Sequence, residues 1–193
     1  MKLSLAELLA FLSRAKVNTF ASDTKRSSPI RPPHSKNYVF DDPPFRYEDQ
    51  YFGEFVDVGE EVVWYKGVPL WGMGYRGGIH PWAFDRRDET FDFLREALRR
   101  PEPDCPIRGP LVYSRGEFAY TVSIVGSVLS FTARETVTHG GTVVAFRDLL
   151  GGLIRGRLNS ELEILEDRPL VAYGSAQNDL ALWSRPGSEA APC

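Results

Sequence analysis

The N-terminal part of the chain has the hydrophobic spacing of an amphipathic helix. Its apolar positions recur at intervals of three or four residues: Leu5, Leu8, Leu9 and Leu12. Such spacing places the side chains on one helix face. Ser4 and Glu7 have the arrangement of a capping box, in which a hydroxyl and a carboxylate bind the first free backbone amides of a helix. The pattern predicts a helix over residues 4–16.

A second helical pattern lies near the middle of the chain and predicts a helix over about 88–100. Its apolar stripe consists of Phe91, Leu94 and Leu98. Asp88 is expected to be the N-cap, and Pro101 ends the helix. The polar, proline-containing segment 21–37 is predicted to be a flexible surface loop, and the C-terminal residues 176–193 a loose tail.

From Tyr38 onward, short runs rich in Val, Phe, Tyr and Trp predict β-strands. They form two units, at about 45–79 and 118–154, that share an order of residues. The matching pairs are Phe45/Phe118, Tyr47/Tyr120, Gly53/Gly126, Glu61/Glu135, Gly67/Gly141 and the glycine pairs 77–78/151–152. We interpret them as a duplicated β unit, with two unrelated hairpins as the alternative.

These elements predict an α+β fold, in which two antiparallel β units form a curved sheet or partial barrel. The N-terminal helix precedes the first unit, and the second helix lies between the two. Residues 1–175 are expected to form a single domain that contains a ligand pocket, because a chain of 193 residues can bury a substantial core.

Aromatic residues crowd into the first β unit around a predicted two-residue turn at Lys66-Gly67. Strict alternation along its strands puts six residues on one face: Glu60, Val62, Trp64, Trp71, Met73 and Tyr75. The matching positions of the second unit are smaller or more polar, and they include Arg147. We therefore predict a pocket walled by Trp64, Trp71, Met73 and Tyr75, with a filled core as the alternative.

Three residues are candidates for catalysis: Glu60, His80 and Tyr75. Burial beside aromatic rings would raise the pKa of a carboxyl group into the range useful for proton transfer, and a histidine at a pocket mouth is a suitable acid or base. Substrate contacts are expected from Tyr47, Trp64, Trp71, Met73, Tyr120 and Arg147. The alternatives are a solvated Glu60, a surface His80 and tyrosines that belong to the core.

The repeated acids Glu61 and Glu135 are expected to form structural ion pairs, with arginines such as Arg46 or Arg76. Adjacent strand residues point to opposite faces, so Glu60 and Glu61 do not act as a pair.

Composition and motifs argue against several classes of function. The net charge is −3, which gives no positive field for nucleic acid, and no apolar run has the roughly 20 residues of a membrane helix. The three histidines lack metal-ligand spacing and no phosphate-binding glycine motif occurs, so neither metal nor cofactor is expected. The N-terminus lacks the features of a secretory signal, and two cysteines give no disulfide framework, which favours the cytoplasm.

Several blocks carry a family resemblance: RPPHSKNYVF, FRYEDQYFG, GEEVVWYKGVPLWGMGYRGG and GGLI. Over about residues 5–154 the chain resembles a mainly bacterial family of domains of unknown function, whose members often follow a helix-turn-helix regulator domain. The resemblance implies no activity and no catalytic residues. This chain begins at the domain and has no DNA-reading helix pair, so a transcription-factor role is not expected.

We predict a small cofactor-independent enzyme that binds a hydrophobic small molecule and promotes its cyclisation or isomerisation, for example a pericyclase of the Diels–Alder type in secondary metabolism. A non-catalytic ligand-sensing domain and a structural or interaction domain remain as alternatives. A homodimer is left open.

Overall fold

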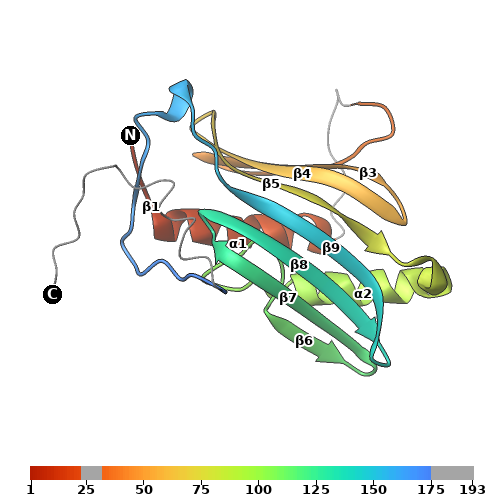
Figure 1. Ribbon diagram of the computed structural model, residues 1–193. Coiled ribbons are helices and arrows are strands. Elements are labelled where there is room, and N and C mark those ends of the chain that lie inside the picture. The colour runs from red at the N-terminus through yellow and green to blue at the C-terminus, as the bar shows by residue number, and fades with distance from the viewer. Residues whose placement is uncertain (23–31, 175–193) are drawn as a thin grey trace, which may run out of the picture.

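The computed structural model describes residues 1–22 and 32–174 and has an α+β fold, as the sequence predicts (Figure 1). Eight antiparallel strands form an open, curved sheet in the order β2-β3-β4-β5-β9-β8-β7-β6. The strands are β2 (Lys36–Asp42), β3 (Phe45–Gly53), β4 (Val56–Tyr65), β5 (Val68–Ile79), β6 (Val112–Arg115), β7 (Phe118–Ser127), β8 (Ser130–His139) and β9 (Thr142–Leu153). The predicted tail, 176–193, and most of the predicted 21–37 loop lie outside the described residues.

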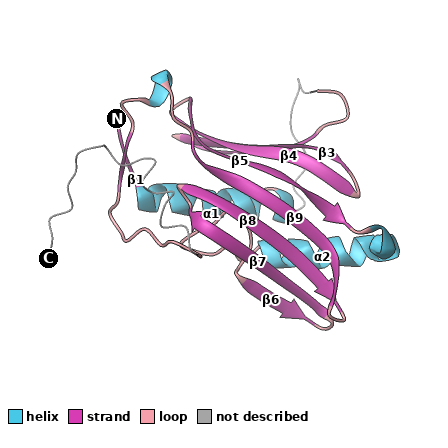
Figure 2. Cartoon of the chain, in the orientation of Figure 1, coloured by secondary structure: helices cyan, strands magenta, loops and turns pink. Residues whose placement is uncertain are grey.

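Two helices, α1 (Leu5–Asn18) and α2 (Arg87–Leu98), lie along one face of the sheet (Figure 2). We call this the inner face and the opposite one the outer face. Short 3-10 segments follow α1 and precede α2: η1 (Phe20–Ser22) and η2 (Pro81–Arg86). A further one, η3 (Arg157–Asn159), precedes β10 (Glu163–Leu165), which pairs in parallel with β1 (Lys2–Ser4). None of the described helices is long and apolar enough to cross a membrane.

Both predicted helices form, with shifted ends. The capping box of α1 is present, because the Ser4 hydroxyl accepts from the Glu7 amide while the Glu7 carboxylate accepts from the Ser4 amide. The N-cap of α2 is Arg86 instead of the predicted Asp88. Because η2 runs directly into α2, the helix begins earlier. Asp88 lies in the first turn, where a carboxylate interacts favourably with the helix dipole.

The two β units, β2–β5 and β6–β9, join through the antiparallel pair β5–β9. Their turns have the same backbone geometry: Lys66 and Gly67 have φ of 52° and 79°, and Gly140 and Gly141 have φ of 55° and 81°. Each unit also contains one β-bulge at the equivalent register position. The shared turn and bulge support the interpretation of a duplicated unit.

The bulge overturns one prediction about the first unit. Val63 pairs with Trp71 whereas Trp64 pairs with Pro69, so Leu70 is an extra residue on β5. An extra residue shifts the alternation of every residue beyond it. Trp71 therefore shares the inner face with Val63, and not with Trp64 as strict alternation predicts.

The inner-face residues of the first hairpin are Glu61, Val63, Trp71, Met73 and Tyr75, and all are buried. Glu60 is exposed and Trp64 half-buried, both on the outer face.

Trp71 and Met73 belong to the packed core. The Trp71 side chain is fully buried, its ring stacks on Phe131 with centroids 5.9 Å apart, and its Nε1 donates to the Val128 carbonyl at 2.8 Å. Burial of this indole stabilises the junction of the two units rather than walling a pocket.

Candidate functional site

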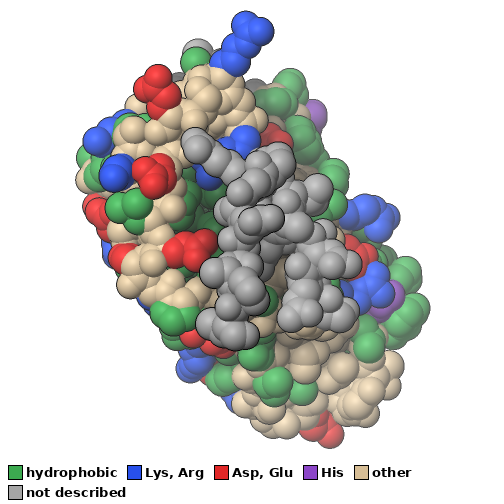
Figure 3. Space-filling model, turned by 60° about the vertical axis from the view of Figure 1, so that its left-hand side comes forward, with side chains coloured by type: hydrophobic (Ala, Val, Ile, Leu, Met, Phe, Trp, Pro, Cys, Tyr) green, Lys and Arg blue, Asp and Glu red, His purple; other side chains and the backbone are tan. Residues whose placement is uncertain are grey.

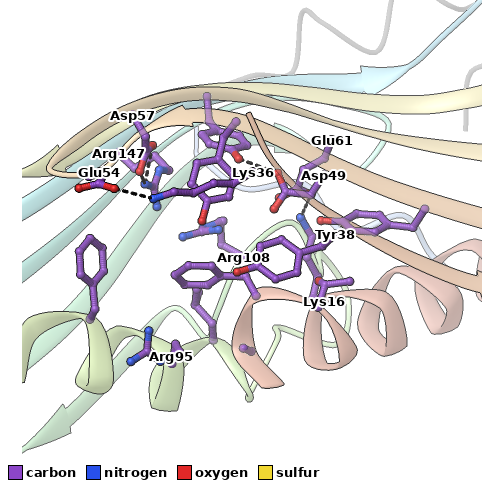
Figure 4. Close-up of a pocket in the computed structure, with 18 of the residues that line it drawn as sticks. Lys16, Lys36, Tyr38, Asp49, Glu54, Asp57, Glu61, Arg95, Arg108 and Arg147 are labelled. Carbon is purple, nitrogen blue, oxygen red and sulfur yellow. Dashed lines mark hydrogen bonds and ion pairs between the residues drawn. The ribbon is translucent and has the colours of Figure 1, made fainter. Parts of the chain in front are cut away.

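A cavity of about 170 Å³ lies between the inner face of β2–β5 and the segments α1, η1 and α2 (Figure 4). Six cationic side chains line it: Lys16, Lys36, Arg87, Arg95, Arg108 and Arg147. Four acidic side chains line it as well: Asp49, Glu54, Asp57 and Glu61. The aromatic part of the wall consists of Phe20, Tyr38, Tyr47, Tyr51, Tyr75 and Phe91. The wall is thus far more charged than the predicted apolar pocket.

On the face that Figure 3 shows, acidic and basic side chains are interspersed. No single sign of charge dominates that face, which agrees with the small net charge of −3. A local excess of one sign inside the cavity is therefore a property of the site itself.

Asp49 and Tyr75 form the central polar contact of the cavity. The Tyr75 hydroxyl donates to Asp49 Oδ1 at 2.6 Å, and both side chains are less than a tenth exposed. Asp49 projects from β3 and Tyr75 from β5, so the phenol crosses the intervening strand β4 to reach the carboxyl group. Both groups line the cavity and are therefore available to a ligand.

Gly59 makes this crossing feasible. It pairs with Tyr75 on one side and with Tyr51 on the other, on the inner face of β4. A Cβ atom at Gly59 would lie 2.5 Å from the Tyr75 hydroxyl and 2.5 Å from the Gln50 carbonyl, distances too short for real contacts. The missing side chain leaves the space through which Tyr75 reaches Asp49.

A second crossing involves Arg147 of β9, whose Nη2 binds both carboxylate oxygens of Asp57 at 2.6 and 2.7 Å. Gly77 of β5 lies between these residues, and a Cβ there would lie 2.5 Å from the Arg147 Cα. Arg147 Nη1 also lies 3.6 Å from Glu135. Its Nε is buried and has no hydrogen-bond partner among the described residues.

The repeated glutamates form ion pairs, though with other partners than predicted. Glu61 binds Lys16 from the last turn of α1, and Glu135 binds Arg108 through two hydrogen bonds of 2.8 and 3.0 Å. Arg46 instead pairs with Asp41 and Glu48. The sequence pattern could not identify Lys16 or Arg108, because both come from outside the β units.

A tyrosine accompanies each of these glutamates at the repeated position. Tyr120 donates to Glu135 at 3.1 Å, and Tyr47 is hydrogen-bonded to Glu61. The set of tyrosine, glutamate and cation is therefore duplicated, which is typical of a structural feature of both units.

Asp49 and Tyr75, in contrast, belong to the first unit alone. Asp49 pairs with Glu61 across the strands, and Val122 pairs with Glu135 at the equivalent place. Leu149 stands where Tyr75 would be. The unit that opens into the cavity therefore carries an acid and a phenol where its copy carries two apolar side chains.

The environment of Asp49 raises its pKa to about 7. The main cause is burial, which removes water from the charged form, and the nearby negative charge of Glu61 acts in the same direction. The hydrogen bond from Tyr75 and the charges of Lys16 and Arg108 oppose the shift. Burial also raises the pKa of Tyr75 well above its ordinary value, so the phenol stays protonated.

The buried network as a whole contains four carboxyl groups and three cations. The carboxyl groups are Asp49, Asp57, Glu61 and Glu135, and the cations are Lys16, Arg108 and Arg147. A proton on one carboxyl group balances the charges, and Asp49 is the group whose raised pKa allows it to hold that proton near neutral pH.

The structure brings three of the predicted site residues to the cavity: Tyr47, Tyr75 and Arg147. Trp71, Met73 and Tyr120 are buried in the core and do not line it. Trp64 and Glu60 lie on the outer face of the sheet. Their assignment to the pocket face was wrong, because it assumed strands without a bulge.

His80 does not lie at the cavity. Its ring stacks on Trp82 at 4.1 Å and near Phe146 at 5.1 Å between centroids. Phe146 alternates with the inner-facing Arg147, so this stack belongs to the outer side of the sheet. The position after the glycine pair, which suggested a pocket mouth, instead starts η2.

The sequence analysis did not identify several side chains of the cavity wall, above all Asp49. The sequence does contain a signal for Asp49, because the aligned repeat places Asp49 of FRYEDQYFG at the position of Val122 in FAYTVSIVG. An acid that replaces an apolar inner-face residue in one copy of a repeat is a reason to examine that position. Among the described residues, no group of three or more His, Cys, Asp and Glu is arranged to hold a metal ion.

Comparison with known proteins identifies one family. Residues 49–154 match the family described as Domain of unknown function (DUF5680). No curated protein and no solved structure matches the chain. The matched region begins at Asp49 and includes Gly59, Tyr75, Gly77 and Arg147.

Proposed function

The chain belongs to the DUF5680 family of domains of unknown function, and from the geometry of its cavity we propose that it is a cofactor-independent enzyme that isomerises or cyclises a small organic molecule by moving a proton. Asp49 is the acid and base, and Tyr75 orients it. The observation that carries the proposal is the buried Asp49–Tyr75 pair, which lines the cavity of one β unit and has apolar counterparts in the other.

The pKa of Asp49 suits proton transfer. A carboxyl group with a pKa of about 7 is present in both protonation states near neutral pH, so it can accept a proton from carbon and return one. In the step that we propose, the Asp49 carboxylate removes a proton from a carbon next to a carbonyl group, and the electron pair moves onto the carbonyl oxygen as an enolate. Asp49 then returns the proton at another position, which completes an isomerisation. In a cyclisation the enolate carbon adds to a second carbonyl carbon of the same molecule, the π electrons of that carbonyl move onto its oxygen, and this oxygen takes the proton from Asp49.

The surrounding charges favour such a step. The transfer moves one negative charge from Asp49 to the substrate and leaves the net charge of the cavity unchanged. The buried cations Lys16, Arg108 and Arg147 are fixed by ion pairs before the reaction, and preorganised charges of this kind stabilise a developing oxyanion.

The size of the cavity limits the substrate. A volume of about 170 Å³ is smaller than the several hundred cubic ångströms of a drug-sized site. An apolar cavity of about 150 Å³ holds one benzene ring in a well-studied engineered protein. A substrate of about one ring therefore fits, and the six aromatic side chains of the wall suit its apolar surface.

Solvent hydrogen exchange tests this proposal without knowledge of the product. The protein is incubated in D2O with single-ring compounds whose carbonyl groups flank a C–H bond, and deuterium incorporation is followed by NMR. We expect exchange with the wild-type protein and at least a hundredfold slower exchange with Asp49→Asn. Equal rates in the two proteins, above those of buffer alone, would remove Asp49 from the mechanism.

A second candidate function is ligand sensing without turnover, in a domain related to the effector domains of helix-turn-helix regulators. The observation that favours it is the buried ion pair between Lys16 of α1 and Glu61 of β4, which connects the cavity wall to a helix on the surface of the domain. Ligand-induced thermal stabilisation without hydrogen exchange would support this candidate over the first. We place either activity in the cytoplasm, on the cysteine usage of the sequence.

A further inference from the structure

We propose that the substrate is an organic anion, a carboxylate carried by a single ring, and that Lys36, Arg95 and Arg147 bind its carboxylate group. The inference rests on the proposed function, since it assigns the substrate class of the same cavity. It adds an anchoring site at the end of the cavity away from Lys16 and Glu61. In Figure 4 Arg147 with Asp57 lies at one end, and Lys16, Glu61 and Asp49 lie at the other.

The charge balance of the cavity wall favours an anion. Six cationic side chains line it against four acidic ones. Arg108 is neutralised by Glu135, which lies outside the wall, so the remaining excess is one positive charge, and protonation of Asp49 enlarges it. Arg95 also pairs with Asp92, whose side chain lies outside the wall and is 66% exposed. Exposed ion pairs contribute little free energy, so the Arg95–Asp92 pair alone does not hold this guanidinium group away from an anion.

Lys36 is held over the cavity by weak contacts. Its side chain is 18% exposed, and its Nζ lies 3.2 Å from the Gly53 carbonyl oxygen and 3.8 Å from Glu54. Glu54 is 69% exposed and therefore strongly solvated. An ammonium group in this position retains donors for a ligand, because Lys carries three and these contacts use two at most.

Arg147 adds a donor that is already buried. Its side chain is 7% exposed, and its Nε has no hydrogen-bond partner among the residues that the structure describes. A buried N–H without a partner is unfavourable, and a hydrogen bond to a ligand oxygen would remove that cost. The guanidinium group is held in place by Asp57 and Glu135, so it binds an anion without further ordering.

The distance between the two ends suits one ring. Lys36 pairs with Tyr51, which lies two residues from Asp49 along β3, so the backbone positions of Tyr51 and Asp49 are roughly 7 Å apart along the strand. A six-membered ring with a carboxyl group spans such a distance, with its far atoms toward Asp49. Tyr51 and Phe91 supply apolar surface at this end of the cavity.

Binding of simple probes tests the anion site separately from catalysis. Benzoate, cyclohexanecarboxylate, benzamide and phenyl phosphate are titrated into the full chain, with affinity measured by calorimetry or NMR. We expect the two carboxylates to bind, benzamide to bind at least tenfold more weakly, and Lys36→Met and Arg95→Met to lose about tenfold in carboxylate affinity. Lys2→Met, on a side chain that is 71% exposed in β1, is the control that keeps full affinity.

Three results would overturn the anion site: benzamide binding as tightly as benzoate, unchanged carboxylate affinity in Lys36→Met, or binding of phenyl phosphate alone. The outcome for catalysis is distinguishable. Benzoate binding that persists in Asp49→Asn, without hydrogen exchange on any probe in the wild type, would leave the anion site standing and reject the acid–base role. Hydrogen exchange on neutral ketones, without preference for substrates that carry a carboxylate, would support the acid–base role and reject the anion site.

Discussion

Tyr75 reaches Asp49 across an intervening strand, over the bare backbone of Gly59, and donates a 2.6 Å hydrogen bond to its buried carboxyl group. The contact joins β5 to β3 and has no equivalent in the second β unit, where Leu149 and Val122 occupy the matching places. An acid with a raised pKa in a cavity is more typical of a functional site than of a feature that stabilises the fold.

The variant Asp49→Asn tests whether the Asp49 carboxyl group serves catalysis or stabilises the fold. The folded-state pKa of about 7 lies above the ordinary 3.8, so the folded protein binds more protons than the unfolded chain between these values. Stability from this group is present below about pH 4 and is lost as the pH rises through 7. Asn carries no charge, so we expect the variant to be more stable than the wild type at pH 8, by an amount on the order of a few kcal/mol.

Urea denaturation at pH 4 and pH 8 measures this difference. The gain should vanish at pH 4, and the catalysis that the wild type shows at pH 8 should be lost in the variant. Glu60→Gln, on the exposed outer face, is the matched control and should change neither property. A lower stability of Asp49→Asn at pH 8 would mean that the carboxylate stabilises the fold instead.

Tyr75→Phe should raise the pKa of Asp49 further, because the hydrogen bond from Tyr75 opposes the effect of burial. The acidic limb of the pH profile, where activity rises as Asp49 loses its proton, should then move to higher pH. Tyr65→Phe, in the same sheet and away from the cavity wall, serves as the control. A profile that stays in place would show that this hydrogen bond has no role in setting the pKa.

Gly59→Ala should damage the site through a single methyl group. The new Cβ would lie 2.5 Å from both the Tyr75 hydroxyl and the Gln50 carbonyl, so we expect a loss of about 1–3 kcal/mol in stability together with a loss of activity. A Cβ atom at Gly74, on the neighbouring strand, would have no other atom within 4 Å, so Gly74→Ala should leave stability and activity nearly unchanged. Thermal unfolding of the two variants tests this expectation. Equal melting temperatures would contradict the close approach of Tyr75 and Gln50 to the backbone of Gly59.

Lys16→Met should destabilise the protein by about 3–5 kcal/mol, because it leaves the buried side chain of Glu61 without its ion-pair partner. The double variant Lys16→Met/Glu61→Gln removes both charges and should recover much of that loss. A double-mutant cycle from urea denaturation gives the coupling between the two side chains. A coupling near zero would show that Glu61 finds another partner.

The local elements could be read from the sequence, because their signals are local. The capping box of Ser4 and Glu7, the turn at Lys66-Gly67 and the recurrence of its geometry 74 residues later all depend on neighbouring residues. The α+β fold with two joined β units follows from these signals. The order of residues in the repeat also indicated that one unit differs chemically from the other.

The face that lines the cavity could not be predicted, because the extra residue Leu70 reverses the alternation between β4 and β5. Because of this bulge, Glu60 and Trp64 lie on the outer face of the sheet and not on the face that lines the cavity. Lys16 and Arg108, whose charges act on Asp49, come from segments that only the tertiary fold brings to the sheet. The cavity is accordingly polar, whereas counting aromatic residues in the sequence predicted an apolar one.

The most direct test of the account is the titration of the Asp49 carboxyl group by carbon-detected NMR, with Asp49→Asn used to assign its signal. We predict a midpoint near pH 7 in the wild type, on a resonance that is missing from the variant. A midpoint near the ordinary aspartate value of about 4 would contradict the claim that Asp49 is a buried acid and base of this cavity.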